Sequence, residues 1–203
     1  MNSYKSMMRE NLQQAFQRPA ADLAASMAAR VENDGSLSFE AFGEPCRVTR
    51  QDITLGGREP EDPRDLLISL YALHAPNEAP SIHPLRAFKD LPGSMPYQQA
   101  FRTHTEMILL PFVSAIQKRQ MEITARFDGE ACTGTGGDFA FLLRPLPKIL
   151  LGYIFYLQDE DFPASATCLF SSNATAFMPL DGLADVAEYT SRGILGLVRA
   201  STL

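Results

Sequence analysis

The stretch FAFLLRPLPKILLGYIFYLQDEDFPASATCLF, residues 139–170, decides the fold of this chain. Every second side chain from Phe139 to Leu143 is large and apolar, which is the period typical of a strand with one buried face. A β-branched and aromatic run from Lys148 to Leu157, and a shorter one from Thr167 to Phe170, favour two more strands. We therefore expect three neighbouring strands, at least two of them antiparallel.

The residues that follow this stretch predict a helix that closes the sheet. Apolar side chains recur at helical spacing from Leu183 to Val198. Asp181 precedes them, and aspartate is a favoured residue at the N-cap because its carboxylate accepts a free backbone N–H. We expect the helix to start at Asp181.

Helical spacing also predicts two helices at the N-terminal end of the chain. One covers about residues 5–17 and ends before a proline. The second begins at Pro19, extends through Val31, and stops at the turn-forming residues Asn33-Asp34-Gly35. Both helices should pack their apolar faces into the core.

Between residues 37 and 55 the apolar period shifts to two, which predicts a small antiparallel unit. We expect Gly43-Glu44-Pro45 to form a turn within it. Asp62 and Pro63 then favour the start of a helix that ends before Pro76.

The middle of the chain predicts a connector followed by helices. Residues 77–96 are rich in proline, although Arg86-Ala87-Phe88 suits a short edge strand. Residues 97–126 read as helical pieces broken at Pro111. The fold class we expect is α+β: N-terminal helices, a small β unit, a middle helical layer and a C-terminal antiparallel sheet closed by the last helix.

The composition is typical of a folded soluble protein. Of the 203 residues, 45% are hydrophobic and 21% charged, too apolar for a disordered chain. A chain of this length can form one core without disulfides or metals. We expect a single domain over residues 1–203, with residues 1–95 and 96–203 as possible lobes.

Charge and hydropathy exclude two classes of partner. The net charge is 18 − 24 = −6, so the average field repels nucleic acid and anionic membrane surfaces. The longest apolar run, residues 149–157, is far shorter than the roughly 20 residues that a membrane span needs. The first ten residues turn polar where a signal peptide is apolar, which favours a cytoplasmic protein.

The three cysteines predict reduced thiols and no resident cofactor. Cys46, Cys132 and Cys168 are odd in number and far apart, so neither a disulfide framework nor a four-cysteine iron–sulfur site is indicated. Cys168 suits a buried position in a strand. Cys132 lies in a polar, glycine-rich loop and is the better candidate for a reactive thiol, although nothing in the sequence shows that its pKa is lowered.

The motifs of known catalytic sites are missing. Gly134-Thr135-Gly136-Gly137-Asp138 precedes a strand instead of a helix, so it lacks the context of a phosphate-binding loop. The acidic residues 159–161 lack the spacing of a calcium loop, and we expect no metal. His104, on the flank of a predicted helix, has no carboxylate partner that the sequence reveals.

A resemblance to a known family rests on four short motifs. They are Gly136-Gly137-Asp138 before the first strand, Leu146-Pro147-Lys148, the acidic loop of residues 158–163 with its Phe-Pro pair, and Met178-Pro179-Leu180 before the last helix. The chain resembles domain-of-unknown-function family 3786 over about residues 20–195. In that family an arginine is commoner at the position of Lys148.

The resemblance implies a context but no activity. The family occurs largely in anaerobic bacteria and archaea, and some members are joined to cysteine-rich iron–sulfur modules like those of corrinoid proteins. This implies a bacterial protein with a link to anaerobic iron–sulfur or corrinoid metabolism.

The sequence favours a non-catalytic module that binds a small molecule or a protein partner. The alternative is an enzyme whose site converges near Asp138, Arg144 and His104. If the first two predicted strands pair, Asp138 and the acidic loop share one sheet end, and Arg144 lies with the next turn at the other. The candidate ligand-binding residues are Asp138, Arg144, Lys148, Asp159, Glu160 and His104.

Overall fold

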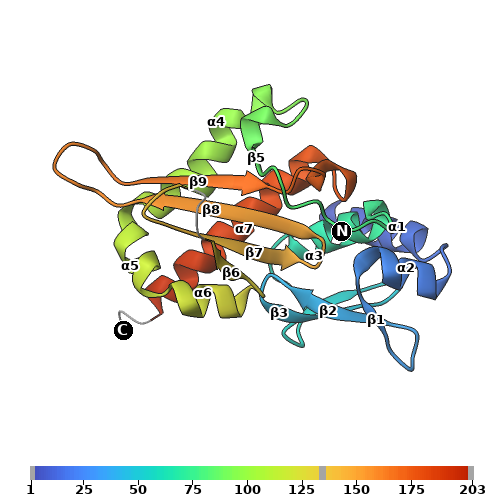
Figure 1. Cartoon of the computed structure of the whole chain (residues 1–203). Helices are drawn as coiled ribbons and strands as arrows, with labels where there is room; N and C mark the ends of the chain where they lie inside the picture. The colour runs from blue at the N-terminus through green and yellow to red at the C-terminus, as the bar shows by residue number, and fades with distance from the viewer. Residues whose placement is uncertain (1–2, 133–135, 201–203) are drawn as a thin grey trace.

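The computed structural model describes residues 3–132 and 136–200, which form two antiparallel sheets with helices packed against them (Figure 1). This confirms the α+β class. Sheet A comes from the N-terminal part of the chain and has its strands in sequence order. These strands are β1 (Arg30–Val31), β2 (Leu37–Ala41), β3 (Glu44–Val48) and β4 (Ile53–Leu55).

Sheet B has the order β5-β9-β8-β7-β6. Its two edge strands, β5 and β6, are also its shortest. The three strands predicted from the sequence are central and antiparallel, as expected. The strands of sheet B are β5 (Arg86–Ala87), β6 (Glu130–Cys132), β7 (Phe139–Leu146), β8 (Ile149–Tyr156) and β9 (Ser165–Phe170).

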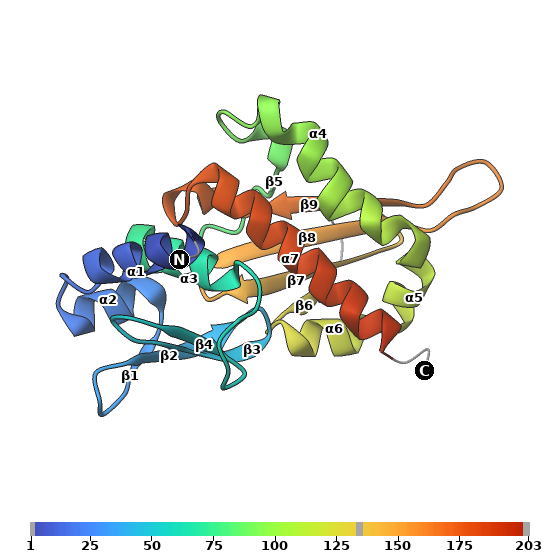
Figure 2. The same ribbon diagram turned by 180° about the vertical axis from the view of Figure 1, so that it is seen from behind.

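The helices lie mostly on one side of sheet B and beside sheet A (Figure 2). Three belong to the first part of the chain: α1 (Ser3–Ala15), α2 (Ala20–Met27) and α3 (Arg64–His74). A broken helical segment follows, made of α4 (Gln98–Phe101), the π-helix η3 (Arg102–Glu106), the 3₁₀ helix η4 (Met107–Phe112), α5 (Val113–Lys118) and α6 (Gln120–Arg126). The remaining elements are α7 (Leu180–Arg199) and the short 3₁₀ helices η1 (Phe88–Asp90), η2 (Met95–Tyr97) and η5 (Ala174–Ala176).

The core lies between sheet B and α7. The inner face of the sheet carries three cross-strand rows, because residues opposite one another on neighbouring strands share a face. The middle row is Phe141, Tyr153 and Cys168, all at most 1% exposed. The Tyr153 hydroxyl reaches α7, 3.0 Å from Ser191 Oγ. Helix α7 therefore covers the inner face of the sheet, as expected.

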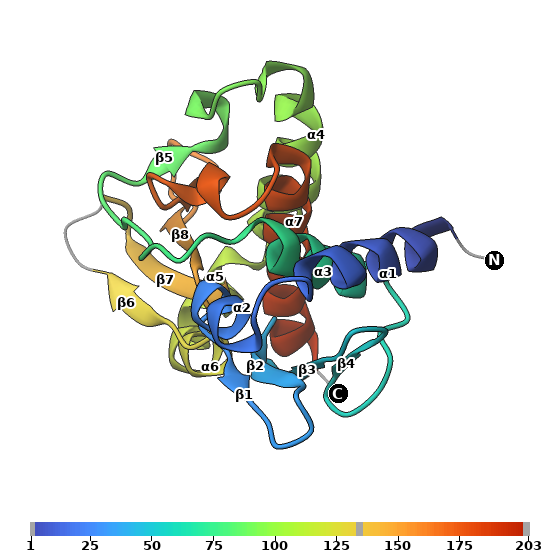
Figure 3. The same cartoon turned by 90° about the vertical axis from the view of Figure 1, so that its right-hand side faces the viewer.

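Helix α3 packs beside sheet A and against α7, and α7 in turn covers sheet B (Figure 3). At Gly182 of α7 an added Cβ would lie 3.6 Å from Leu70 Cδ1 of α3 and 2.8 Å from Met178 Cγ, so the two helices pack closely there. Buried residues of sheet A, of the helices and of sheet B form one continuous cluster. None of the helices within residues 3–132 and 136–200 is both long and apolar enough to cross a bilayer.

The predicted second helix is wrong in its extent. Helix α2 ends at Met27, because Ala28 adopts a left-handed conformation (φ 52°) and ends the helix. Val31 then pairs with Leu37 in sheet A, so Asn33-Asp34-Gly35 forms a strand turn and does not stop a helix. Leu23, Met27 and Val31 lie four residues apart. The last of them, Val31, suits this spacing in a helix but is equally suited to a strand.

Three smaller expectations are also corrected. Helix α7 begins at Leu180, after Pro179, so Asp181 lies in its first turn instead of at the N-cap. The turn of sheet A is Phe42-Gly43, and Glu44 and Pro45 belong to β3. Cys132 lies in β6, paired with Ala140, and not in a loop. The sequence did not predict this strand because it is too short to show a period.

Candidate functional site

A cleft lies between the two sheets. We call it the intersheet cleft; it has a volume of about 820 Å³, within the range of roughly 300–1,000 Å³ of small-molecule pockets. Strands β1 to β3 form one wall, and the start of β6 with the end of β7 forms the other. Its charged and polar side chains are Arg30, Ser38, Glu40, Asp128, Glu130 and Arg144.

A proline in β7 produces the joint between the walls. Pro145 has no N–H for the ladder, and the register of β7 against β8 shifts between Leu143 and Leu146. The freed carbonyl of Pro145 instead accepts a hydrogen bond of 2.6 Å from the N–H of Phe42, in the turn of sheet A. The bulge therefore holds sheet A to sheet B and places Arg144 at the cleft.

The turn that meets Pro145 has a demanding geometry. Phe42 and Gly43 both have positive φ, 52° and 72°, as two-residue hairpin turns of this type require. Phe42 is 5% exposed, so burial of its ring offsets the strain of a left-handed conformation. At Gly43 an added Cβ would lie 2.5 Å from the Arg126 carbonyl oxygen, so only glycine fits.

Two arginines line the intersheet cleft without a close ion-pair partner among the described residues. Arg144 Nε lies 3.7 Å from Asp128 Oδ2, a weak pair because the Asp128 side chain is 83% exposed. Arg30 is exposed on the opposite wall, and its side chain forms no hydrogen bond or ion pair with any residue that the structure describes. Neither guanidinium group has its donors satisfied within the described part of the chain.

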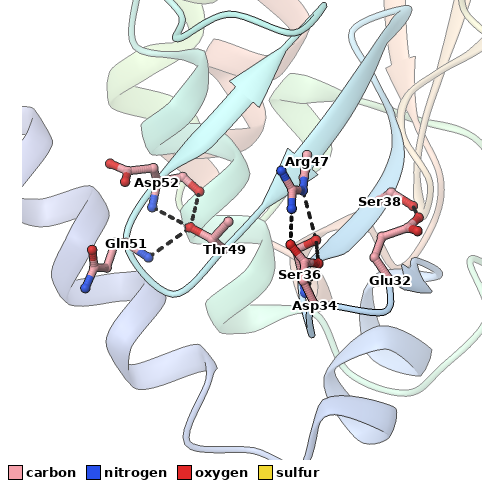
Figure 4. Close-up of polar contacts among 8 residues, drawn as sticks. All are labelled: Glu32, Asp34, Ser36, Ser38, Arg47, Thr49, Gln51 and Asp52. Carbon is pink, nitrogen blue, oxygen red and sulfur yellow. Dashed lines mark hydrogen bonds and ion pairs between the residues drawn. The ribbon is translucent and has the colours of Figure 1, made fainter.

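The neighbouring polar residues of sheet A have partners (Figure 4). Arg47 Nε donates to Ser36 Oγ at 2.9 Å, and another nitrogen of Arg47 pairs with Asp34. Ser38 Oγ donates to Glu32. Register places Arg30 opposite Ser38 and Ser38 opposite Arg47, on one face. Arg30 therefore stands out as the unpaired cation of this face.

Figure 4 also shows the turn that connects β3 to β4. Thr49 Oγ1 accepts hydrogen bonds from the N–H groups of Asp52 at 3.0 Å and Gln51 at 3.2 Å. The turn is thus stabilised by its own side chain. It lies outside the lining of the intersheet cleft and has a structural explanation.

Carboxylates share the cleft with the arginines. Asp128 has a positive φ of 46° and ends the helical segment before β6. Burial raises the pKa of the Cys46 thiol, and the charge of Glu40 adds to the rise. Since Cys46 is 3% exposed and its pKa lies far above the ordinary value, it lines the cleft as a neutral group. The lining therefore combines both charge signs and no activated thiol.

Only one predicted site residue, Arg144, lies in the intersheet cleft. Asp138 lies at the other end of β7, where its Oδ2 accepts the N–H of Leu157 at 2.6 Å. Asp159 Oδ1 accepts the N–H groups of Asp161 and Phe162, at 2.9 and 2.7 Å. The structure thus brings Asp138 and the acidic loop to one sheet end, as the predicted strand pairing implied.

The other predicted residues are separate from the cleft. Lys148 is 7% exposed, and its Nζ donates to the Pro76 carbonyl at 3.1 Å, which ties the β7–β8 turn to the segment after α3. Burial lowers the pKa of Lys148. His104 is exposed on the π-helix η3, and Glu160 is exposed beyond β8. The enzyme alternative, with Asp138, Arg144 and His104 in one site, stays a prediction that this placement does not favour.

The cysteine and glycine motifs have structural places. Burial raises the pKa of Cys132, and Glu130 adds to the rise, so its thiolate is disfavoured. Gly136 and Gly137 both have positive φ and lead into β7, while Gly134 and Thr135 lie outside the described residues. Within residues 3–132 and 136–200 no group of three or more His, Cys, Asp or Glu side chains is placed to hold a metal ion.

A partly buried polar cluster between sheet B and η3 was not predicted. Glu106 Oε1 accepts the N–H of Cys168 at 3.0 Å, and burial raises the pKa of Glu106 despite that bond and the nearby Arg102. Thr105, fully buried beside it, has a hydroxyl without a hydrogen-bond partner among the described residues. No sequence pattern indicated this cluster, because the π-helical turn η3 and strand β9 are far apart along the chain.

Replacing Glu106 by glutamine should make the folded protein more stable at pH 7 than the wild type. The amide oxygen still accepts the Cys168 N–H, and the partly buried charge is removed. Because the pKa of Glu106 is raised above its ordinary 4.5, its contribution is fully present below about that pH and is lost as pH rises through the folded value. Urea denaturation at pH 4 and pH 7 should show the gain shrinking at the lower pH.

The matched variant is Glu106→Ala, which leaves the Cys168 N–H unpaired. It should lose about 1–3 kcal/mol at pH 4 and less at pH 7, where it also removes a carboxylate that burial disfavours. A Glu106→Gln variant that is equally or less stable at pH 7 would contradict the assignment of a carboxylate that partial burial disfavours.

The missed cleft residues gave little sequence signal. Arg30 lies in no recognisable sequence motif. Glu130 belongs to a strand that is too short to predict from the sequence. Asp128-Gly129 was recognisable only as a helix end. At Gly129 an added Cβ would lie 2.2 Å from the Leu142 carbonyl oxygen, so this glycine brings the backbone of the cleft wall against β7.

Comparison with known proteins identifies a family. No curated protein and no solved structure matches this chain. A family model does, over residues 19–192, which is most of the sequence and includes β1 to β9. Both walls of the intersheet cleft lie within the matched residues. The chain therefore belongs to the family described as Domain of unknown function (DUF3786).

Proposed function

We propose that the protein is a binding module that takes a small molecule with a carboxylate or phosphate group into the intersheet cleft. The observation that carries this proposal is the placement of Arg30 and Arg144 on opposite walls of one cleft. Arg30 has no partner among the described residues, and Arg144 has only the 3.7 Å pair with Asp128. Guanidinium groups bind both anions through paired N–H donors.

The acidic side chains of the cleft restrict the ligand. Glu40, Glu130 and Asp128 disfavour a ligand that is anionic throughout, because like charges repel at short range. A ligand with one anionic end and one amine or hydroxyl end satisfies both kinds of side chain. Among dicarboxylates this favours one that also carries an amine, such as glutamate, over one without an amine, such as succinate.

Isothermal titration with inorganic phosphate, succinate and glutamate tests the proposal. At least one of these probes should bind the wild type saturably. Arg144→Ala and Arg30→Ala should each weaken that binding at least about tenfold, since a charged hydrogen-bonded contact is worth roughly 1.5–3 kcal/mol. Arg144→Lys should weaken it less than Arg144→Ala, because it keeps the charge and loses the fork.

The control is Arg86→Ala on edge strand β5, which removes an exposed cation outside the cleft. Its affinity should stay within about twofold of the wild type. The proposal is wrong if no probe binds at millimolar concentration, or if Arg86→Ala weakens binding as much as Arg144→Ala does.

A further inference from the structure

The β8–β9 connection projects from the molecule. We call residues 157–164 the arm; Figures 1 and 2 show it extending beyond the end of sheet B, away from the rest of the chain. The arm carries Phe162, whose side chain is 69% exposed. The Phe162 ring stacks on no aromatic or cationic group among the described residues. A large apolar ring is therefore presented to solvent.

The conformation of the arm is fixed by its own hydrogen bonds. Asp159 accepts the N–H groups of Asp161 and Phe162, and its own N–H donates to the Phe162 carbonyl at 3.0 Å. At the base Asp138 accepts the N–H of Leu157. The exposed ring thus sits on an ordered loop, which reduces the entropy that a partner must overcome on binding.

The ring stands among negative charges. Asp159, Glu160 and Asp161 precede it, and all three are exposed. Carboxylates next to an apolar anchor are repelled by anionic lipid headgroups, so a membrane surface is a poor occupant. A second copy of the chain also carries a net charge of −6 and is repelled at long range. Charge complementarity favours a cationic surface.

We propose that the arm docks into another protein, with Phe162 entering an apolar pocket whose rim carries Lys and Arg side chains. Aromatic side chains that fill such pockets are the residues that dominate many interfaces. The acidic residues of the arm would pair with the rim, which raises the association rate and selects against neutral pockets. The arm and the intersheet cleft lie at opposite ends of β7, so the two sites can be occupied independently.

A synthetic host of the same chemistry tests the proposed recognition. The probe is a β-cyclodextrin that carries an ammonium group on every sugar, which combines an apolar cavity with a cationic rim. This host should bind the wild type at least about tenfold more tightly than it binds Phe162→Ser. Neutral β-cyclodextrin should bind the wild type at least about tenfold more weakly than the cationic host does, and the affinity of the cationic host should fall as salt is added. The control, Met121→Ser, removes another exposed apolar side chain (87% exposed) and should bind like the wild type.

The partner is then tested in an extract of the source cells. A photo-crosslinking phenylalanine analogue at position 162 should capture a protein that the same analogue at position 121 does not. That protein, once purified, must bind the wild type with a Kd that rises at least tenfold for Phe162→Ser and for the Glu160→Gln, Asp161→Asn double variant. Circular dichroism checks that each variant is folded.

Three outcomes overturn the proposal. One is a cyclodextrin affinity that Phe162→Ser leaves unchanged. A second is the lack of any capture at position 162 beyond that at position 121, or a captured protein whose purified form binds both variants as well as the wild type. The third is binding of the wild type to anionic phospholipid vesicles that depends on Phe162. None of them depends on Arg30 or Arg144.

Discussion

Replacing Gly43 by alanine is expected to lower the free energy of unfolding by about 3 kcal/mol. Gly43 has a φ of 72°, and an L side chain in that region costs roughly 1–2 kcal/mol. Its new Cβ would also lie 2.5 Å from the Arg126 carbonyl oxygen and 2.9 Å from Arg126 Cγ, which forces backbone movement at a further cost of about 1–3 kcal/mol. Urea denaturation measures the loss.

The matched control is Gly35→Ala in the β1–β2 turn. Gly35 has a similar φ of 77°, but an added Cβ meets nothing within 4 Å. It should therefore cost only the backbone part, roughly 1–2 kcal/mol. Equal losses for the two variants would mean that the contact between the sheet A turn and Arg126 is not close.

Replacing Phe141 by alanine should cost about 4 kcal/mol, within the range of 3–5 kcal/mol seen for buried phenylalanines. Phe141 is fully buried in the middle row of sheet B. Its ring lies 5.3 Å from that of Phe155 and 5.8 Å from that of Tyr153, so the substitution removes aromatic contacts and leaves a cavity beneath α7. The loss should appear in the denaturation midpoint.

Phe162→Ala provides the comparison for the same chemical change at an exposed site. Because its ring is 69% exposed on the arm, the free energy of unfolding should change by no more than about 0.5 kcal/mol. A loss above 1 kcal/mol would show that Phe162 supports the fold, and would count against its role as a free docking anchor.

The sequence predicted those parts of the fold that depend on local periodicity. The alternation from Phe139 to Leu143 and the run to Leu157 identified the central strands, since one face of each is buried beneath α7. The paired ends of these strands placed Asp138 near the acidic loop. Edge strand β6 was missed, because three residues with pattern exposed-exposed-half-buried carry no period.

The intersheet cleft depends on contacts between residues that are distant in sequence. Phe42 meets Pro145 through one backbone hydrogen bond, about a hundred residues away along the chain, and no local pattern encodes that pairing. The sequence identified Arg144 as a candidate site residue because it lies beside the predicted turn. Arg30, on the opposite wall of the cleft, was predicted to lie in a helix. Predicting the site required knowing how sheet A rests on sheet B.

The position of α7 in the chain affects how the protein folds. This helix covers the inner face of sheet B and packs on α3, yet it follows every strand in sequence order. While the polypeptide is being made, all strands of sheet B leave the ribosome before the helix that covers them has been made. The aromatic rows of β7 and β8 are then exposed on a nascent chain, which is the state that chaperones bind and that aggregates most readily.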